Sequence, residues 1–273
     1  MGWGKPMTVV ERPIESCISL RAAFLRLWLL ALAGAAAAAA EPLPANLLAG
    51  AGLSEFAMRA VGFLNTAMIL AALIGVGAIA AREVGLYSIL APRVPLHTLR
   101  AGRAFHWVQA AVLIGGIVAL AQGVFDLWFW RAVPDGEVSL LRQAEQMAAV
   151  SPLTGLFLHA VNEELMLRWG LMSGLLWVLA LLFRQKPGRP KAVLAWAAII
   201  GVSLFSALGQ VPSLAHVVAT DPAGILLVRT AVAGAVAGIA YGWLYWKHGL
   251  EAAILAHVAA QACLMAFAGA TLA

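Results

Sequence analysis

Long apolar segments separated by short polar stretches make up most of this chain. A helix rises about 1.5 Å per residue, so about 20 apolar residues cross the ~30 Å hydrocarbon core of a membrane. Seven segments are candidates for such helices. They cover residues 27–40, 60–81, 104–125, 152–183, 192–210, 223–246 and 250–272. The pattern predicts an all-α, polytopic membrane helix bundle of about seven transmembrane helices.

Two of these segments can be interpreted in more than one way. The first ends in six alanines before Glu41, which resembles the cleavage site of a signal peptide. The stretch that precedes it is long for a signal peptide, so we favour an uncleaved first span. Pro212 interrupts the uncharged stretch 192–220, and proline breaks the hydrogen-bond ladder of a helix. A fifth span followed by a loop is therefore predicted there.

The basic residues predict the orientation in the membrane. Residues 82–103, 184–191 and 247–248 hold nine of the 18 Lys and Arg residues. The loops predicted on the opposite side carry most of the acidic loop residues. These are Glu41, Glu55, Asp135, Glu137, Glu145 and Asp221. Lys and Arg accumulate in cytoplasmic loops, so the N-terminus is predicted in the cytoplasm and the C-terminus outside.

Composition supports the same class of protein. The chain is 63% hydrophobic and only 11% charged, far below the roughly 25% charged residues of soluble domains. The net charge of +5 comes from topology signals, so no nucleic-acid partner is predicted. We expect an integral protein of a bacterial cytoplasmic membrane, in contact with the lipid bilayer. Its predicted parts are a cytoplasmic tail (1–21), three transmembrane helices (22–130), an outside loop (131–150) and a four-helix core (151–273).

The fourth apolar segment carries Glu163, Glu164 and Arg168. Each such group costs roughly 2.5–3.5 kcal/mol at the centre of a membrane helix. Glu164 and Arg168 are four residues apart, so they are expected to pair. Glu163 points about 100° away and has no local partner, which makes it a candidate general base. The alternative is that all three groups only hold helices together.

Other polar groups lie in the later spans. His257 and Gln261 are four residues apart in the seventh segment, where an imidazole and an amide could polarise a carbonyl or hold an oxyanion. A lone membrane histidine is more often a core group. Gln210 ends the fifth segment, and His216 is assigned to the following loop. No cofactor is predicted: a divalent metal needs several spaced ligands, and the sequence gives it no support.

Three motifs resemble one family. Residues 163–168, E-E-L-M-L-R, are similar to the EExxxR motif of CPBP intramembrane proteases. This family includes type II CAAX prenyl endopeptidases and bacteriocin-processing or self-immunity proteins. Residues 249–257 resemble the last motif, in which a His is followed four residues later by Asn or Asp. Residues 207–212 resemble the middle motif, usually a Phe followed by a His before Leu-Pro. The resemblance covers residues 150–270.

The resemblance implies a hydrolase embedded in the membrane, a glutamate protease. Glu163 would activate a water for attack on a peptide carbonyl, and His257 with Gln261 would stabilise the oxyanion. Arg168, paired with Glu164, would orient the motif helix. The substrate would be a peptide or protein, prenylated or otherwise anchored in the membrane. Two positions depart from the family pattern, because Gln210 replaces the middle His and Gln261 replaces the final Asn.

These departures keep other functions open. A catalytically inactive scaffold, or an immunity or peptide-binding protein on the same fold, would explain both glutamines. A small transporter could use the carboxylates as a proton relay. The chain lacks a repeated half and a matching pair of broken helices, so the transporter ranks last. We favour the active peptidase.

Overall fold

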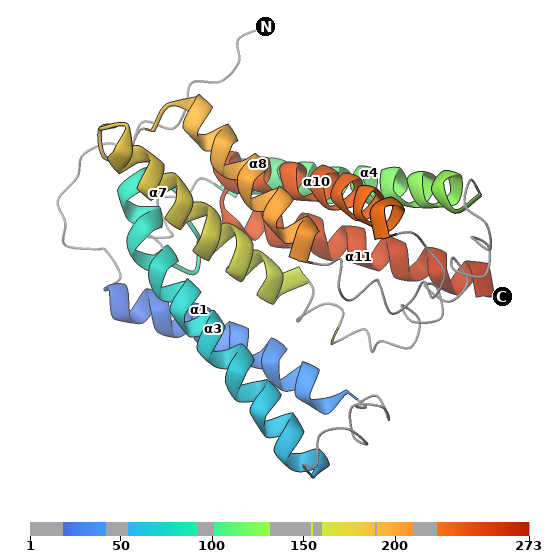
Figure 1. The fold of residues 1–273 in the computed structure, drawn as a ribbon. Coiled ribbons are helices and arrows are strands. Elements are labelled where there is room, and N and C mark those ends of the chain that lie inside the picture. The colour runs from blue at the N-terminus through green and yellow to red at the C-terminus, as the bar shows by residue number, and fades with distance from the viewer. Residues whose placement is uncertain are drawn as a thin grey trace, which may run out of the picture.

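The structure, a computed structural model, describes residues 19–41, 54–91, 101–131, 154, 160–188, 190–209 and 223–272. All the long elements in these ranges are helices (Figure 1). They are α1 (Leu20–Ala40), α3 (Glu55–Val84), α4 (Ala101–Arg131), α8 (Ala192–Gly209), α10 (Ala223–His248), α11 (Leu250–Leu272), and one continuous helix from Ala160 that contains η4 (Leu165–Met172) and α7 (Ser173–Leu182). Seven long helices within the described ranges confirm the predicted all-α bundle.

Six of these helices are long and apolar enough to cross a membrane, judged over the part of the chain that the structure describes. The remaining one, α10, has 26 residues but contains Arg229 and ends in Lys247 and His248. Its length is sufficient for a span, since about 20 residues are needed. The helices therefore occupy the segments that the hydrophobic pattern predicted.

Some helices extend beyond the apolar segments. Helix α1 begins at Leu20, because the Ser19 Oγ accepts a hydrogen bond from Ala22 N at 3.2 Å and caps the helix there. The helix therefore also includes two arginines that precede the apolar segment. The predicted tail therefore ends inside the first turn of α1. Helix α4 continues through the aromatic stretch 126–130 to Arg131. A charged residue does not by itself end a helix. The length of an apolar segment therefore underestimates the length of the helix that contains it.

The order of the helices in space differs from their order in the sequence (Figure 1). Helix α3 packs against α1 on one side and against η4 and α7 on the other. Helix α8 packs against α7 and α10, and α10 also contacts α11. Helix α4, which follows α3 in the chain, instead lies along α11. The motif helix therefore lies in the interior of the bundle.

Small residues set the contact between α8 and α10. A Cβ atom at Gly238 would fall 2.5 Å from the Ser203 Oγ, and one at Gly234 would fall 2.7 Å from the Ala207 Cβ. Gly242 faces Ile199 in the same way. The three glycines recur every four residues, so they form one smooth stripe that lets the backbones approach. A side chain at any of these three positions would collide with α8.

Two of the polar segments predicted on one side of the membrane, 184–191 and 247–248, lie against the third, 82–103. Gly188 N donates to Glu83 O at 2.6 Å, and Leu250 N donates to Tyr87 O at 3.2 Å. The Tyr87 hydroxyl donates to His248 O at 2.7 Å. Burial, with the Glu251 charge second, raises the pKa of the Tyr87 phenol, so it remains a donor. The grouping agrees with the predicted topology.

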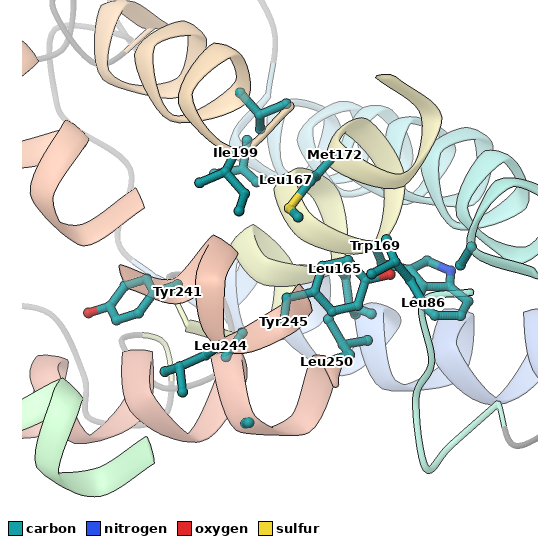
Figure 2. Packing of buried hydrophobic residues seen from close by; sticks show 14 of the residues in the cluster. Leu86, Leu165, Leu167, Trp169, Met172, Ile199, Tyr241, Leu244, Tyr245 and Leu250 are labelled. Atoms are coloured by element: carbon teal, nitrogen blue, oxygen red, sulfur yellow. The ribbon is translucent and has the colours of Figure 1, made fainter. Parts of the chain in front are cut away.

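The apolar core surrounds the motif helix. Leu165 and Met172 from η4 pack with Ile199 of α8 and with Leu244 and Leu250 of α10 and α11 (Figure 2). All five side chains are essentially inaccessible. Charges placed within such a core interact strongly, because little water screens them.

Candidate active site

The backbone of the motif region is wider than an α-helix. Residues Leu165–Met172 form a π-helix, and the Ser173 N–H and Oγ both donate to the carbonyl of Arg168, five residues earlier. Such segments are rare and occur frequently at functional sites. This geometry was not predicted from the sequence. The π-helix follows Glu163 and Glu164 directly and includes Arg168.

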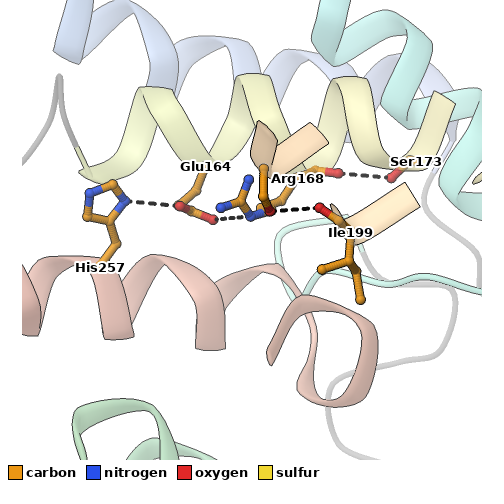
Figure 3. Close-up of polar contacts among 6 residues, drawn as sticks. Glu164, Arg168, Ser173, Ile199 and His257 are labelled. Carbon is orange, nitrogen blue, oxygen red and sulfur yellow. Dashed lines mark hydrogen bonds and ion pairs between the residues drawn. The ribbon is translucent and has the colours of Figure 1, made fainter. Parts of the chain in front are cut away.

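Glu164 lies at the centre of a buried polar cluster (Figure 3). Its Oε1 is 3.0 Å from the Nδ1 of His257, and its Oε2 is 3.4 Å from the Nε of Arg168. The carboxylate side chain is 1% exposed and the Arg168 side chain 3%. Glu164 therefore bridges the motif helix to α11. The Glu164–Arg168 pair was predicted, whereas the Glu164–His257 contact was not.

The two contacts of Glu164 differ in kind. The Oε2–Nε contact is an ion pair without hydrogen-bond geometry, and neither atom has a hydrogen-bond partner within the described residues. The Oε1–Nδ1 contact has the length of a normal hydrogen bond. His257 is therefore the more closely bound partner of this carboxylate.

Helix α10 supports both ends of the cluster. The Tyr241 ring stacks on the His257 ring, with centroids 4.8 Å apart and planes 22° apart. Four residues later, the Tyr245 hydroxyl is 2.8 Å from the Ser173 Oγ, which also bonds the Arg168 carbonyl. Neither tyrosine was predicted from the sequence as a site residue. The available signal was a tyrosine deep in an apolar span, since a buried hydroxyl usually finds a polar partner.

Glu163 has a different environment from its neighbour. It is partly exposed, and it makes no hydrogen bond or ion pair with any described residue. Its charge still acts on the rings of His257 and Tyr241. The contrast expected from the sequence, one carboxylate paired and the other without a partner, is thus present among the described residues.

The structure describes only some of the remaining predicted site residues. Gln261 lies one turn beyond His257 on α11 and is partly exposed. Gln210 and His216 lie outside the described residues. In the part of the chain that the structure covers, no three His, Cys, Asp or Glu residues are arranged to hold a metal ion.

Asn162, the residue before the two glutamates, fixes the motif helix to α1. Its Nδ2 donates to the carbonyl of Ala31 at 3.1 Å. Gly34 of α1 leaves room for it, since a Cβ there would overlap the Asn162 side chain. The start of the motif is therefore anchored on one side by α1 and on the other by α11.

A second ion pair within the membrane helices was missed altogether. Arg229 of α10 donates from Nε to Asp126 Oδ1 at 2.9 Å and from Nη2 to Oδ2 at 2.8 Å, and its guanidinium lies 5.6 Å from the centre of the Trp130 ring. An arginine inside an apolar segment implies an acidic partner. The sequence could not identify that partner, which lies 103 residues away on α4.

We expect Arg229→Lys to lower the free energy of unfolding by about 1.5–3 kcal/mol, because lysine cannot form the two-point contact with Asp126. Equilibrium unfolding in mixed detergent micelles would measure this. Arg26→Lys is the matched control, since Arg26 is exposed on α1, and it should stay within about 0.5 kcal/mol. Equal values for the two variants would mean that the Asp126 contact adds no stability.

These observations first define a class: an integral membrane bundle with two adjacent carboxylates, an arginine and an imidazole in its interior. Residues 145–263 match the family model described as Type II CAAX prenyl endopeptidase Rce1-like. The matched segment is the one that resembles the CPBP family of intramembrane proteases, and it contains all six predicted site residues. The match confirms the resemblance drawn from the motifs, and it points to a protease-type enzyme that acts on a protein or peptide. No curated protein and no solved structure matches the chain.

Proposed function

We propose that this protein is an intramembrane endopeptidase that hydrolyses a peptide bond with water activated by Glu163. One observation carries the proposal: Glu164 is enclosed by Arg168 and His257, whereas the adjacent Glu163 is partly exposed and without a described partner. A carboxylate that is accessible and not neutralised can accept a proton from water. The match of residues 145–263 to a prenyl endopeptidase family supports the same chemistry.

The other residues have distinct roles in this proposal. Glu163 removes a proton from water, which attacks the carbonyl carbon. His257 and the Gln261 amide, on one face of α11, hold the oxyanion that forms. Arg168 and Glu164 fix the motif helix against α11, so that base and oxyanion site keep their separation. Placement within about 1 Å matters for such a site.

The position of the cluster bears on the substrate. His257 and Tyr241 each lie eight residues from Gly249, at the turn between α10 and α11. At about 1.5 Å per residue, the cluster is about 12 Å along the helices from that turn. The turn belongs to the face that we predict to be cytoplasmic. A peptide anchored in the membrane, by a lipid or by its own apolar segment, is therefore the proposed substrate.

A second candidate is a silent member of the family that binds a peptide without cutting it. Gln210 favours it, since an amide cannot accept a proton as the family's histidine can. Gln261 favours it as well, because one additional methylene displaces the amide donor.

The test uses purified wild type, Glu163→Ala and Gln210→His in detergent with a diverse peptide pool, read by mass spectrometry in water enriched in heavy oxygen. Glu83→Ala, an exposed position at the end of α3, is the matched control. Heavy oxygen at a new C-terminus, lost in Glu163→Ala and kept in Glu83→Ala, supports the peptidase. Cleavage only by Gln210→His, or by none of the four proteins, favours the silent binding protein.

A further inference from the structure

Building on the proposed peptidase, we infer that Glu164 and His257 form a carboxylate–imidazole dyad whose Nε2 protonates the leaving amine. This gives His257 a step that oxyanion binding alone does not include. It also gives Glu164 a part in catalysis beyond its pairing with Arg168.

The contact between the two side chains fixes the roles of the ring nitrogens. Glu164 Oε1 lies 3.0 Å from His257 Nδ1, and an ionised carboxylate only accepts hydrogen bonds. Nδ1 must therefore carry the proton in this contact. Nε2, across the ring, is left for another partner (Figure 3). A carboxylate that holds Nδ1–H is also how serine hydrolases orient their catalytic histidine.

Exposure identifies the member of the dyad that a substrate can reach. The His257 side chain keeps 14% of its surface accessible, while that of Glu164 keeps 1%. An incoming peptide would therefore meet the imidazole and not the carboxylate. Glu163, also partly exposed, acts electrostatically on the same ring. Base and proton donor are thus both partly accessible, and the charge of one acts on the other.

The ring is also held from the other directions. Tyr241 stacks on its face at 4.8 Å, and Arg168 lies beside the second oxygen of Glu164. With one carboxylate oxygen beside Arg168, the other remains directed at Nδ1. A proton donor has to be placed within hydrogen-bond reach of the leaving atom, and these contacts restrict the ring accordingly. Tyr241 is therefore a positioning residue for His257.

The proton balance closes without a co-reactant. Glu163 takes one proton from water as the C–O bond forms, which gives a tetrahedral oxyanion. His257 begins the cycle as the imidazolium, with a proton on Nε2 as well as on Nδ1. It donates the Nε2 proton to the amide nitrogen, the C–N bond breaks as the oxyanion becomes a carbonyl, and the neutral amine leaves beside a carboxylic acid. The proton held by Glu163 returns to Nε2. The net reaction is the addition of one water across one peptide bond.

The experiment compares two versions of whichever peptide is cleaved: the normal peptide and an analogue with sulfur in place of the scissile N–H. A thiol has a pKa of about 8.5, so thiolate leaves without being protonated, whereas an amine cannot. We expect His257→Gln to slow peptide hydrolysis by about 10²–10⁴-fold, the range for a general acid. Thioester hydrolysis should be slowed at least tenfold less than peptide hydrolysis.

Tyr241→Leu should show the same selectivity at smaller magnitude, which keeps the test available if His257→Gln does not fold. Cys263→Ala, exposed on the same helix, is the control and should change neither rate. If His257→Gln slows hydrolysis of the two substrates equally, His257 acts only on the oxyanion and the inference is overturned. If only Tyr241→Leu folds, equal losses in that variant have the same meaning. Hydrolysis of neither substrate by wild type would instead overturn the proposed function, and this inference with it.

Discussion

Glu163→Gln is expected to lower kcat for peptide hydrolysis by about 10²–10⁴-fold while the thermal midpoint of unfolding stays unchanged. The reason is that Glu163 makes no hydrogen bond or ion pair with a described residue. The amide has nearly the same shape but cannot accept the proton of water. Loss of activity without loss of stability is what distinguishes a base from a structural carboxylate.

Glu164→Gln, the same substitution one residue later, is the matched control and should behave differently. It removes the counter-charge of a buried arginine and of His257, and breaking such a buried pair costs about 3–5 kcal/mol. Parallel thermal unfolding and peptidase assays on both variants would measure the contrast. Equal destabilisation by both substitutions would mean that Glu163 also has a structural partner, and would remove the basis for choosing it as the base.

The sequence predicted the elements of the fold well because their signals are local. Length and hydrophobicity located the helices, and a four-residue spacing predicted the Glu164–Arg168 pair. Each of these relations is contained within one helix. A one-dimensional pattern is sufficient to read them.

What the sequence did not reveal depends on which helices become neighbours. His257 is 93 residues from Glu164, and the two meet only because α11 packs against the motif helix. The packing of α4 against α10 decides that Asp126 meets Arg229. The π-helix at Arg168 depends likewise on its surroundings, since Ser173 is held there by Tyr245 of α10. None of these partners can be identified from spacing along the chain.

The ion pair at the centre of the site has a measurable energetic role. Arg168→Leu is expected to lower the free energy of unfolding by about 3–5 kcal/mol, because it leaves the Glu164 carboxylate buried without its guanidinium. Equilibrium unfolding in mixed micelles is the measurement. Arg26→Leu, which changes an exposed arginine of α1, controls for the removal of a positive charge and should shift stability by about 0.5 kcal/mol or less.

A double-mutant cycle then separates the pair from its surroundings. Glu164→Leu in the Arg168→Leu background removes both charges, and replacing a buried pair by apolar groups is often neutral or stabilising. The double variant should therefore be more stable than Arg168→Leu alone, although His257 loses its acceptor. If the two single losses simply added, the 3.4 Å contact would carry no coupling energy. Arg168 would then act on the motif helix through its packing, and the pair could not be what keeps Glu164 directed at His257.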